Sequence, residues 1–277
     1  MSNPHLPMVA TVAEKVQETP DIFTLKLSIQ QNNKKIQLQY SPGQFNMLYL
    51  YSVGEIAISI VSDPNDELIS HTIRSVGRVT NGMRQLKVGD QLGIRGPFGR
   101  GWPLVPSEKK DIVIVTGGLG CAPVVSVIHY IIKRKSNFGR LIILQGVKHS
   151  ADLIWKAQYE QWASVEGVDV RIAASESSEK GWPWYSGRVT NMIKNFSYDE
   201  NNTVVMMCGP EPMMLAAVDA LKKECIPEKS IWLSMERNMQ CAIGHCGHCQ
   251  FGNQFICKQG PIFSYSEIKD LFGKRGL

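Results

Sequence analysis

The sequence predicts an antiparallel six-stranded β-barrel, then a doubly wound parallel α/β domain, and finally a cysteine-rich tail. Three observations predict this order. Short stretches of alternating apolar and polar residues fill the first hundred positions, and apolar runs then alternate with helical patterns. Four of the 7 cysteines lie close together near the C-terminus. Because 277 residues suit two domains and an appendage, we expect boundaries at 1–107, 108–234 and 235–277.

The composition is that of a globular protein, with 43% hydrophobic and 20% charged residues. The net charge of +5 comes from scattered Lys and Arg, so we expect no nucleic-acid partner. The N-terminal residues lack a signal-peptide pattern, and the most apolar segment, from Ile112, is interrupted by glycines and a proline. We therefore expect no membrane insertion and a cytoplasmic location. An odd number of cysteines favours metal ligation in a reducing compartment over a disulfide framework.

The barrel prediction rests on six alternating stretches separated by turn-prone segments such as SPGQ, SDPNDE and KVGD. The stretches are Met8 to Val16, Ile22 to Leu27, Gln44 to Tyr51, Ile56 to Val61, His71 to Val79 and Gln91 to Ile94. Short strands at this spacing are typical of a small antiparallel barrel.

The second domain is predicted from strand-like and helix-like segments in alternation. The strand-like runs are DIVIVTGG, LIILQGV, VDVRIAAS, TVVMMCGP and SIWLSM, and the helix-like runs are APVVSVIHYIIKRK, SGRVTNMIKNF and EPMMLAAVDALKKE. This alternation predicts a parallel sheet, whose ligands bind at the carboxyl ends of the strands.

Two glycine-bearing turns follow strands of that sheet. One reads TGGLGCAP from Thr116, and the other reads CGPEPMM from Cys208. Glycine lets a backbone approach a phosphate closely, and the start of a helix offers N–H groups to an anion. Either turn alone could be a tight connection without a ligand. Two such turns in one sheet build one crevice, so together they favour nucleotide binding.

The cysteine group is Cys241, Cys246, Cys249 and Cys257. The spacing C-x4-C-x2-C followed by a fourth cysteine is the plant-type pattern for a 2Fe-2S cluster, and thiolates are soft ligands for iron. A four-cysteine zinc site is the main alternative, although zinc sites usually pair two C-x2-C motifs. A Rieske centre would need histidine ligands, and we expect His245 and His248 to be exposed loop residues. Cys225, outside the group, is expected to be a buried thiol.

The chain resembles the ferredoxin-NADP reductase superfamily, and within it the dihydroorotate dehydrogenase electron-transfer subunits and the gamma subunits of cytoplasmic NiFe hydrogenases. The stretches PGQFNMLYL, HTIRSVGRVT, GPFGRGWPL and MERNMQCAIGHCGHCQ carry this resemblance. It implies a flavin-binding barrel, FAD, NAD(P) and a 2Fe-2S cluster. It places the pyridine-nucleotide pyrophosphate at Gly117, Gly118, Gly120, Ala122 and Pro123, the nicotinamide beside Cys208, Gly209, Pro210 and Met213, and the flavin at Ile58, Ser59, Ile60, Ile73, Arg74, Thr80 and Gly82.

Two points depart from the family or stay open. The arginine that the family uses on the flavin pyrophosphate is replaced by Ile56, and Arg74 or Arg84 could supply the charge instead. Without the resemblance, the stretch IAIS from Ile56 would be interpreted as an ordinary buried strand. Cofactor choice is open: Ser175, Ser177, Lys180 and Arg188 suit a 2'-phosphate, whereas Glu176 suits a ribose diol. Cys208 either positions the nicotinamide or is simply a small packed residue.

The resemblance implies a subunit that moves electrons between NAD(P)H and hydrogenase or another redox subunit in a hetero-oligomer. Subunits of sulfite reductase or dihydroorotate dehydrogenase, a stand-alone NAD(P)H:ferredoxin reductase, and a zinc-bearing interaction module are the alternatives. We expect a partner to dock near the cysteine loop. Phe255, Phe263 and Tyr265 could contact it, although packing within the tail is the simpler expectation.

Overall fold

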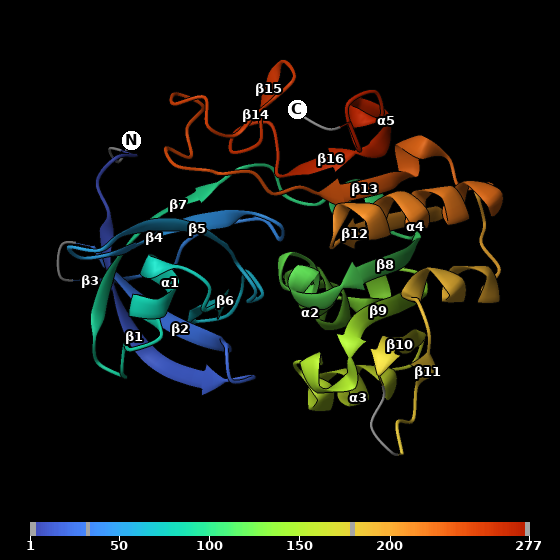
Figure 1. The fold of residues 1–277 in the computed structure, drawn as a ribbon, viewed down its shortest axis with the longest axis horizontal. Helices are drawn as coiled ribbons and strands as arrows, with labels where there is room; N and C mark the ends of the chain where they lie inside the picture. The colour runs from blue at the N-terminus through green and yellow to red at the C-terminus, as the bar shows by residue number, and fades with distance from the viewer. Residues whose placement is uncertain (1–3, 32–33, 178–180, 275–277) are drawn as a thin grey trace. The chain divides into compact units, whose positions relative to one another are not determined.

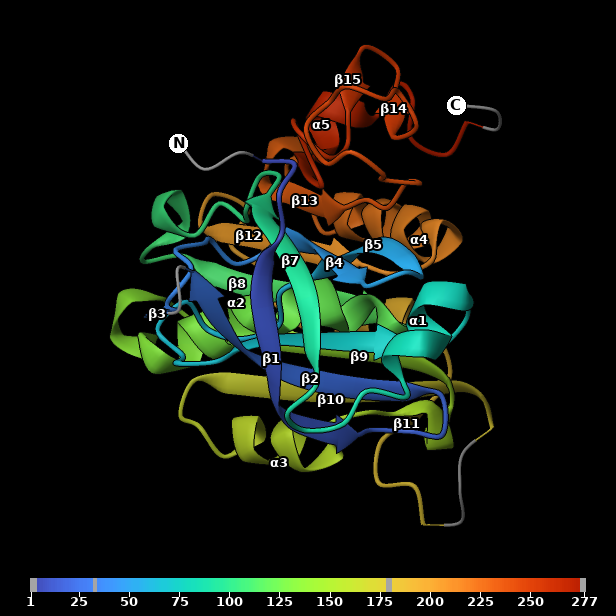
Figure 2. The ribbon, with the colours of Figure 1, turned by 90° about the vertical axis from the view of Figure 1, so that its left-hand side faces the viewer.

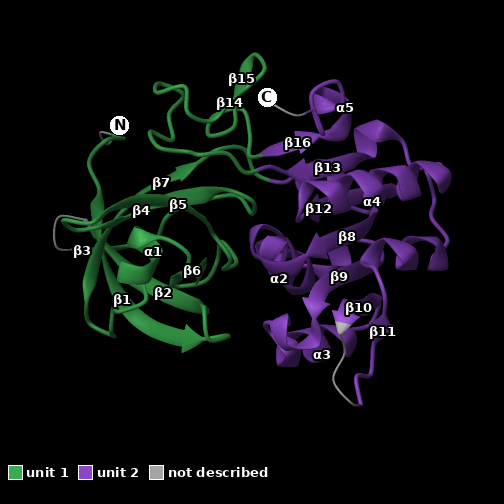
Figure 3. Cartoon of the chain, viewed as in Figure 1, with its two compact units in different colours: residues 1–101, 236–261 green, residues 102–235, 262–277 purple. Residues whose placement is uncertain are grey.

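The computed structural model describes residues 4–31, 34–177 and 181–274. The chain forms two compact units (Figure 3). The first contains residues 1–101 and 236–261, and the second contains residues 102–235 and 262–277. The C-terminal segment is therefore divided: its cysteine-bearing part belongs to the first unit, and its last residues belong to the second.

The first unit contains an antiparallel sheet that the described residues build from seven strands (Figure 2). The strands are β1 (Met8–Gln17), β2 (Ile22–Gln31), β3 (Lys34–Ile36), β4 (Phe45–Leu50), β5 (Gly54–Ser59), β6 (Ile69–Arg74) and β7 (Gln91–Phe98). Their order is β3-β2-β1-β7-β4-β5. Strand β3 pairs with residues 29–31 of β2, and β6 pairs with residues 22–27 of the same strand. The six predicted strands are all present. The short strand β3 was not predicted, because its three residues carry little alternation.

Apolar side chains from every second strand position fill the interior of this sheet. In β2, Phe23, Leu25 and Leu27 are 0–1% exposed. Side chains alternate between the two faces of a strand, so the residues of this set all point to the same side. Each fully buried apolar side chain of this size contributes about 1.5–3 kcal/mol to folding. The alternation that predicted the barrel is therefore also what stabilises it.

The predicted strand from His71 to Val79 is too long. Strand β6 ends at Arg74, and helix α1 (Arg78–Met83) follows after a short turn. The Thr80 hydroxyl accepts hydrogen bonds from the backbone N–H groups of Val76 (3.1 Å) and Gly77 (3.0 Å). These bonds satisfy donors at the start of the helix and favour the helix over a continued strand.

The second unit is a seven-stranded sheet among its described residues, ordered β11-β10-β9-β8-β12-β13-β16. All neighbours are parallel except β13 and β16, which are antiparallel. Helices cover both faces, with α2 and α3 on one side and α4 on the other (Figure 1). Residues 112–115 of the central strand β8 are 0% exposed, as expected for a parallel strand covered on both faces.

The strands of this unit are β8 (Asp111–Gly117), β9 (Leu141–His149), β10 (Val168–Ser177), β11 (Tyr185–Ser186), β12 (Thr203–Cys208), β13 (Ile231–Ser234) and β16 (Ile262–Ser264). The α-helices are α2 (Ala122–Lys133), α3 (Lys156–Ala163), α4 (Glu211–Lys223) and α5 (Tyr265–Ile268). Short 3-10 helices are η1 (Val105–Ser107), η2 (Gly118–Cys121), η3 (Lys135–Asn137), η4 (Ser150–Asp152), η5 (Val189–Asn195) and η6 (Glu228–Ser230).

The helix-like segment SGRVTNMIKNF forms a helix, the 3-10 helix η5. The expectation of a buried Cys225 was wrong, because this residue is exposed. Helix α4 ends at Lys223, and the chain leaves it through Cys225 in a left-handed conformation with φ of 60°. Sequence pattern could not show that this cysteine lies beyond the end of the buried helix face.

The segment 236–261 is mostly irregular among its described residues and contains one small hairpin, β14 (Gln250–Phe251) with β15 (Gln254–Phe255). It contacts the barrel part of the first unit through backbone bonds. The N–H of Arg100 donates to the Gly260 carbonyl at 2.5 Å, and Arg100 and Pro261 form an isolated β-bridge. The segment that carries the cysteine loop is thus hydrogen-bonded to the residues that follow β7.

Candidate functional site

Two glycine turns leave neighbouring strands at the carboxyl end of the parallel sheet. Helix η2 follows β8, and Gly209 and Pro210 follow β12, which ends at Cys208. The two strands are paired in parallel, with Thr116 opposite Cys208. The turns therefore start side by side, where open α/β sheets bind their ligands.

Three glycines allow these turns to pack closely against each other and against the Met213 side chain of α4. A Cβ atom on Gly120 would lie 2.4 Å from the Cys208 carbonyl oxygen. One on Gly117 would lie 2.5 Å from the Met213 sulfur, and one on Gly209 would lie 3.0 Å from the Gly117 nitrogen. Gly118 differs, because a Cβ there would meet nothing within 4 Å while its φ is +55°. Glycine is therefore favoured at position 118 by the left-handed backbone conformation and not by a lack of room for a side chain.

A cavity of about 440 Å³ lies beside the two turns in the second unit. Of the residues predicted to bind nucleotide, Gly117, Gly118, Pro210 and Met213 line it. The remaining predicted residues, namely Gly120, Ala122, Pro123, Cys208 and Gly209, lie in the adjoining turns and at the start of α2, and the described lining does not include them. The full lining is Gly117, Gly118, Gly146, Val147, Lys148, Ser175, Arg188, Val189, Thr190, Pro210, Pro212, Met213 and Ala216.

Several lining residues were missed by the sequence analysis. Gly146 stands at the end of the apolar run LIILQG in β9, which is the same signal that identified Gly117. Gly146 was therefore predictable from the sequence. Val189 and Thr190 come from η5, and no local signal marks them because only the fold brings them to the cavity. Pro212 of α4 lies in the segment CGPEPMM, but it was not among the predicted contacts.

Charged groups gather at one part of the cavity. Lys148 and Arg188 line it, and the Lys148 Nζ lies 3.2 Å from a Glu176 carboxylate oxygen. Ser175 also lines the cavity, and its hydroxyl donates to the Val147 carbonyl at 3.4 Å. The Ser177 side chain and Lys180, two further candidates for a 2'-phosphate, lie outside the described residues. Cations and a carboxylate are both present, so the choice between NAD and NADP stays open.

A second cavity of about 500 Å³ lies elsewhere in this unit and contains no predicted site residue. It is bordered by Val170, Arg171, Ile172, Pro183, Trp184, Tyr185, Met192, Asn195 and Phe196. Although it is slightly larger, it lacks the glycine turns that bring a backbone close to a phosphate. The smaller cavity is therefore the better nucleotide candidate.

The residues predicted to contact a flavin lie at three strand or helix ends of the barrel. Ile58 and Ser59 end β5, and Ile60 follows them and is fully buried. Ile73, also fully buried, and Arg74 end β6. Thr80 and Gly82 belong to α1. Ile56 pairs with Leu48 of β4 and is half-buried, so IAIS is a half-buried strand rather than a fully buried one.

A buried histidine fixes the end of β5. His71 is 0% exposed, and its Nδ1 lies 2.9 Å from the Ser59 carbonyl oxygen, to which a neutral ring donates. Its Nε2 then accepts a hydrogen bond from the Asn46 amide at 3.2 Å. Burial lowers the pKa of His71 to about 4. The ring is therefore neutral at pH 7, and both nitrogens are used.

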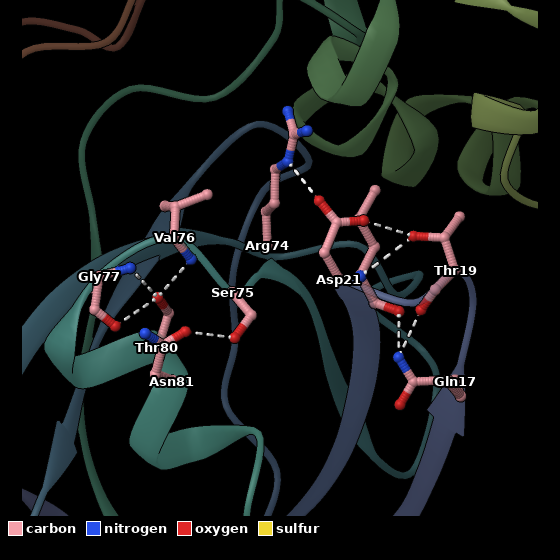
Figure 4. A network of polar contacts seen from close by, with 10 residues as sticks. Gln17, Thr19, Asp21, Arg74, Ser75, Val76, Gly77, Thr80 and Asn81 are labelled. Carbon is pink, nitrogen blue, oxygen red and sulfur yellow. Dashed lines mark hydrogen bonds and ion pairs between the residues drawn. The ribbon is translucent and has the colours of Figure 1, made fainter.

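Arg74 is held in place by an acidic residue from another strand connection (Figure 4). Its Nε donates to Asp21 at 2.8 Å, while 57% of its side chain stays exposed. The Thr19 hydroxyl donates to the same carboxylate at 2.8 Å. The hydrogen bond from Thr19, followed by that from Arg74, lowers the pKa of Asp21. The pair presents a positioned guanidinium at the end of β6, and Asp21 carried no sequence signal for this role.

Thr80 and Gly82 shape the turn and helix between β6 and β7. The Thr80 hydroxyl accepts from two backbone N–H groups and donates to the Gly77 carbonyl at 3.1 Å (Figure 4). A Cβ on Gly82 would lie 2.5 Å from a Leu50 methyl carbon. Both residues therefore have local roles in packing and capping, and their contact with flavin stays a prediction.

The four predicted cysteine ligands lie in one loop, and left-handed backbone turns shape it. Ala242, Gly244 and Gly247 have φ angles of 64°, 75° and 78°. Backbone N–H groups point at the sulfur atoms: that of Gly244 lies 3.2 Å from the Cys257 sulfur, and that of His245 lies 3.2 Å from the Cys241 sulfur. Such N–H groups stabilise thiolates, as a metal-binding loop requires. His248, like His245, is exposed, as predicted.

Backbone hydrogen bonds to sulfur link the cysteines of the loop as two pairs. The N–H of Cys246 donates to the Cys241 sulfur at 3.5 Å, and the N–H of Cys257 donates to the Cys249 sulfur at 3.5 Å. Burial, together with the neighbouring Cys249 thiol, raises the pKa of Cys257 to about 12. Among the described residues, no three His, Cys, Asp or Glu side chains converge on one point where they could hold a single metal ion. Four cysteines in one loop supply the number of ligands that a 2Fe-2S cluster requires.

A buried ion pair lies beside this loop in the first unit. Arg95 of β7 donates through Nε and Nη2 to the two oxygens of Glu55 at 2.7 and 2.6 Å. Its Nη1 donates to the carbonyl of Pro4 at 2.7 Å and, more weakly, to that of Cys241 at 3.4 Å. The Arg95 side chain is 7% exposed and that of Glu55 is 23% exposed. One arginine thus connects the barrel, the N-terminal segment and the first cysteine of the loop.

The tail aromatics are mostly packed. Phe263 of β16 is 1% exposed, whereas Phe255 and Tyr265 are half-buried. The packing expectation is therefore confirmed for Phe263. Within the part of the chain that the structure describes, no helix has the length and apolar character needed to cross a membrane.

Family comparisons identify two segments of the chain. Residues 114–219 match the oxidoreductase NAD-binding domain, and residues 236–269 match the iron-sulfur cluster binding domain of dihydroorotate dehydrogenase B. The first segment contains both glycine turns and the whole cavity lining. The second contains all four cysteines of the loop. The predicted nucleotide and cluster regions therefore coincide with these two families.

Similar proteins are redox enzymes or their subunits by name. The chain is 34% identical to the sulfhydrogenase 1 subunit gamma of Pyrococcus furiosus over 83% of this chain and 80% of that one. It is 32% identical to a probable dihydroorotate dehydrogenase B (NAD(+)) electron transfer subunit of the same organism, over 86% of this chain and 85% of the relative. A solved structure of an NADH-dependent reduced ferredoxin-NADP oxidoreductase shares the fold, with a TM-score of 0.72, 21% identity, and coverage of 99% of this chain and 96% of the other.

Proposed function

Since this chain belongs to the family that includes the sulfhydrogenase gamma subunits and the dihydroorotate dehydrogenase B electron-transfer subunits, we propose that it carries electrons between NAD(P)H and a partner redox subunit through FAD and a 2Fe-2S cluster. The observation that carries the proposal is one loop in which backbone N–H groups are directed at cysteine sulfurs, in a chain that also has a cavity beside two glycine turns. The NAD-binding and cluster-binding family matches support the same assignment.

The residues of the second unit bind the nucleotide. Gly117 and Gly118 bring the backbone of the first turn to the pyrophosphate, and Gly120 lets the second turn pack against the first. Pro210 and Met213 border the same cavity on the side of the second turn. These roles require no side chain that acts as an acid or base, because hydride transfer moves no separate proton.

The residues of the first unit hold FAD and the cluster. A hydride carries two electrons whereas an iron-sulfur cluster accepts one, and bound FAD supplies the conversion between them. Arg74 is the cation that suits the flavin pyrophosphate, because Asp21 fixes its position while most of its side chain is exposed. This assignment would explain how the barrel tolerates Ile56 where the family has arginine. Ile58, Ser59, Ile60, Ile73, Thr80 and Gly82 complete the proposed flavin region.

The cluster loop has an exposed and a buried side. Cys246 is exposed, whereas Cys249 and Cys257 are each 1% exposed. Cys246 is thus the cluster ligand that a partner could reach, and we place the partner over Cys246 and the exposed residues beside it. The partner is a hydrogenase subunit in a cytoplasmic hetero-oligomer. The 32% identity to a dihydroorotate dehydrogenase B subunit supports a second candidate, in which the partner oxidises dihydroorotate.

Cofactor and metal analysis tests the proposal. Protein purified without oxygen should contain about two iron and two sulfide ions and one FAD per chain. One zinc ion without iron or flavin would overturn the proposal and support an interaction module instead. Purification of the chain from its source under mild conditions identifies the partner: a hydrogenase large subunit supports the first candidate, and a dihydroorotate-oxidising subunit supports the second.

A further inference from the structure

A buried glutamine beside the nucleotide cavity has no part in the functions assigned so far. Gln145 of β9 is 1% exposed and lies in the otherwise apolar run LIILQGV. It is the register partner of Thr116 on β8. A buried amide is costly unless its polar atoms are paired, so its presence in a central parallel strand needs an explanation.

All the polar atoms of Gln145 are used. The Thr116 hydroxyl donates to its Oε1. Its Nε2 donates to the carbonyl of Gly118 at 3.1 Å and to that of Gly146 at 3.0 Å. A rotated amide would set its oxygen against two carbonyl oxygens, so only this orientation satisfies every group. Both carbonyls belong to residues that line the nucleotide cavity.

The bond to the Gly118 carbonyl fixes the direction of a peptide group. In a planar trans peptide the C=O and the following N–H point in opposite directions. When Gln145 holds the Gly118 carbonyl on its own side, the N–H of Leu119 is directed to the opposite side of the turn. Gly118 has a φ of +55° and no atoms within 4 Å of where a Cβ would lie, so neighbouring side chains do not restrain it. The glutamine supplies that restraint.

We infer that Gln145 is a positioning residue for pyridine-nucleotide binding: it clamps the carbonyls of Gly118 and Gly146 so that the turn after β8 presents its N–H groups to the pyrophosphate. The inference rests on the proposed function, because it assigns the cavity to a pyridine nucleotide. Gln145 does not touch the nucleotide itself. Its effect is on binding, and it leaves the reacting atoms unchanged.

The test compares two substitutions in the full-length, cofactor-loaded chain. Gln145→Met keeps the length of the side chain and removes all three hydrogen bonds. Thr116→Val removes one buried hydrogen bond and keeps both bonds from Gln145 to the turn. Dissociation constants for NAD⁺ and NADP⁺ are measured by calorimetry, with melting temperatures as the measure of general destabilisation.

We expect Gln145→Met to weaken binding of the preferred nucleotide roughly 10- to 30-fold, as loss of one to two buried hydrogen bonds would. Thr116→Val should also lower the melting temperature, because it leaves the buried Oε1 of Gln145 without a donor, but it should change the dissociation constant less than about 3-fold. At saturating nucleotide, the turnover number with ferricyanide should be the same in Gln145→Met and wild type. The substitution should therefore raise KM for the nucleotide and leave kcat unchanged. Gln145→Glu provides a second variant if Gln145→Met does not fold, and it should weaken binding at least as much because its carboxylate faces two carbonyls.

Three results would overturn the inference. Wild-type affinity in Gln145→Met or Gln145→Glu would show that the clamp is not needed. Equal weakening in Gln145→Met and Thr116→Val would indicate general destabilisation rather than positioning. If the wild-type chain binds neither NAD⁺ nor NADP⁺ at millimolar concentration, the proposed function itself fails and the inference fails with it.

Discussion

Replacement of Gly120 by alanine tests how the two nucleotide turns fit together. The added Cβ would lie 2.4 Å from the Cys208 carbonyl oxygen, 2.7 Å from its carbonyl carbon and 2.7 Å from the Gly209 Cα. Ordinary van der Waals contact begins at 3.4 Å, so the turns must separate by about 1 Å. All three atoms belong to the backbone, and no side-chain rotation can relieve the contact.

We expect Gly120→Ala to destabilise the protein by about 2–3 kcal/mol, the upper part of the range for overpacking, because backbone must move. For a domain of this size the melting temperature should fall by roughly 5–10 °C. The nucleotide dissociation constant should rise at least about 10-fold, because a 1 Å displacement of a positioned site is costly. Calorimetric melting and nucleotide titration of the cofactor-loaded chain measure both quantities.

Gly118→Ala is the matched control in the same turn. A Cβ there meets no atom within 4 Å, and its only cost is the left-handed φ of +55°. That strain amounts to about 1–2 kcal/mol, less than the clash at position 120. If Gly120→Ala melts and binds nucleotide like wild type, or if Gly118→Ala is the more destabilised of the two, the packing of the turns is not as described.

The remaining predictions concern the first unit and its loop. Arg95→Met should destabilise the protein by about 3 kcal/mol in urea unfolding, because it leaves the partly buried Glu55 without its partner. The double variant Arg95→Met, Glu55→Leu should recover part of this loss, and additive effects of the two substitutions would refute the pairing. The pKa of His71 is about 4 in the folded protein and 6.5 in the unfolded chain, so its contribution to the free energy of unfolding is complete above pH 6.5. The protein should lose roughly 3 kcal/mol of this free energy as the pH falls to 4. His71→Gln should lack this loss when urea unfolding is measured at each pH. Cys257→Ser should strongly reduce bound iron in metal analysis, whereas Cys225→Ser, which changes an exposed cysteine outside the loop, should retain it.

The predictable part of the candidate nucleotide site has local signals. Gly117 ends one apolar strand and Gly209 directly follows another, and parallel strands bring their carboxyl ends to one edge. Lys148 and Gln145 were not predictable in the same way. A lysine near the end of a strand has no distinguishing pattern, and a glutamine in an apolar run shows its role only when its three hydrogen-bond partners are known.

In the barrel, several features depend on contacts that the sequence does not indicate. Alternation predicted its strands, but the end of β6 depends on the Thr80 hydroxyl, whose hydrogen bonds to two backbone N–H groups outweigh the strand tendency of the preceding residues. The pairing of Arg74 with Asp21 joins residues 53 positions apart. No sequence spacing indicates such a contact. The altered flavin motif at Ile56 could therefore be noted from sequence, while a replacement cation could be chosen only from the structure.

The central claim is that electrons from NAD(P)H reach the cluster within this chain. The most direct test is anaerobic addition of NADH or NADPH to the purified, cofactor-loaded chain, followed by low-temperature paramagnetic resonance. We expect the signal of a reduced 2Fe-2S cluster, and we expect Cys257→Ser to abolish this signal while flavin bleaching persists. If the flavin of the wild type is bleached but the cluster stays oxidised, although dithionite reduces it, electrons do not pass from the flavin to the cluster in this chain.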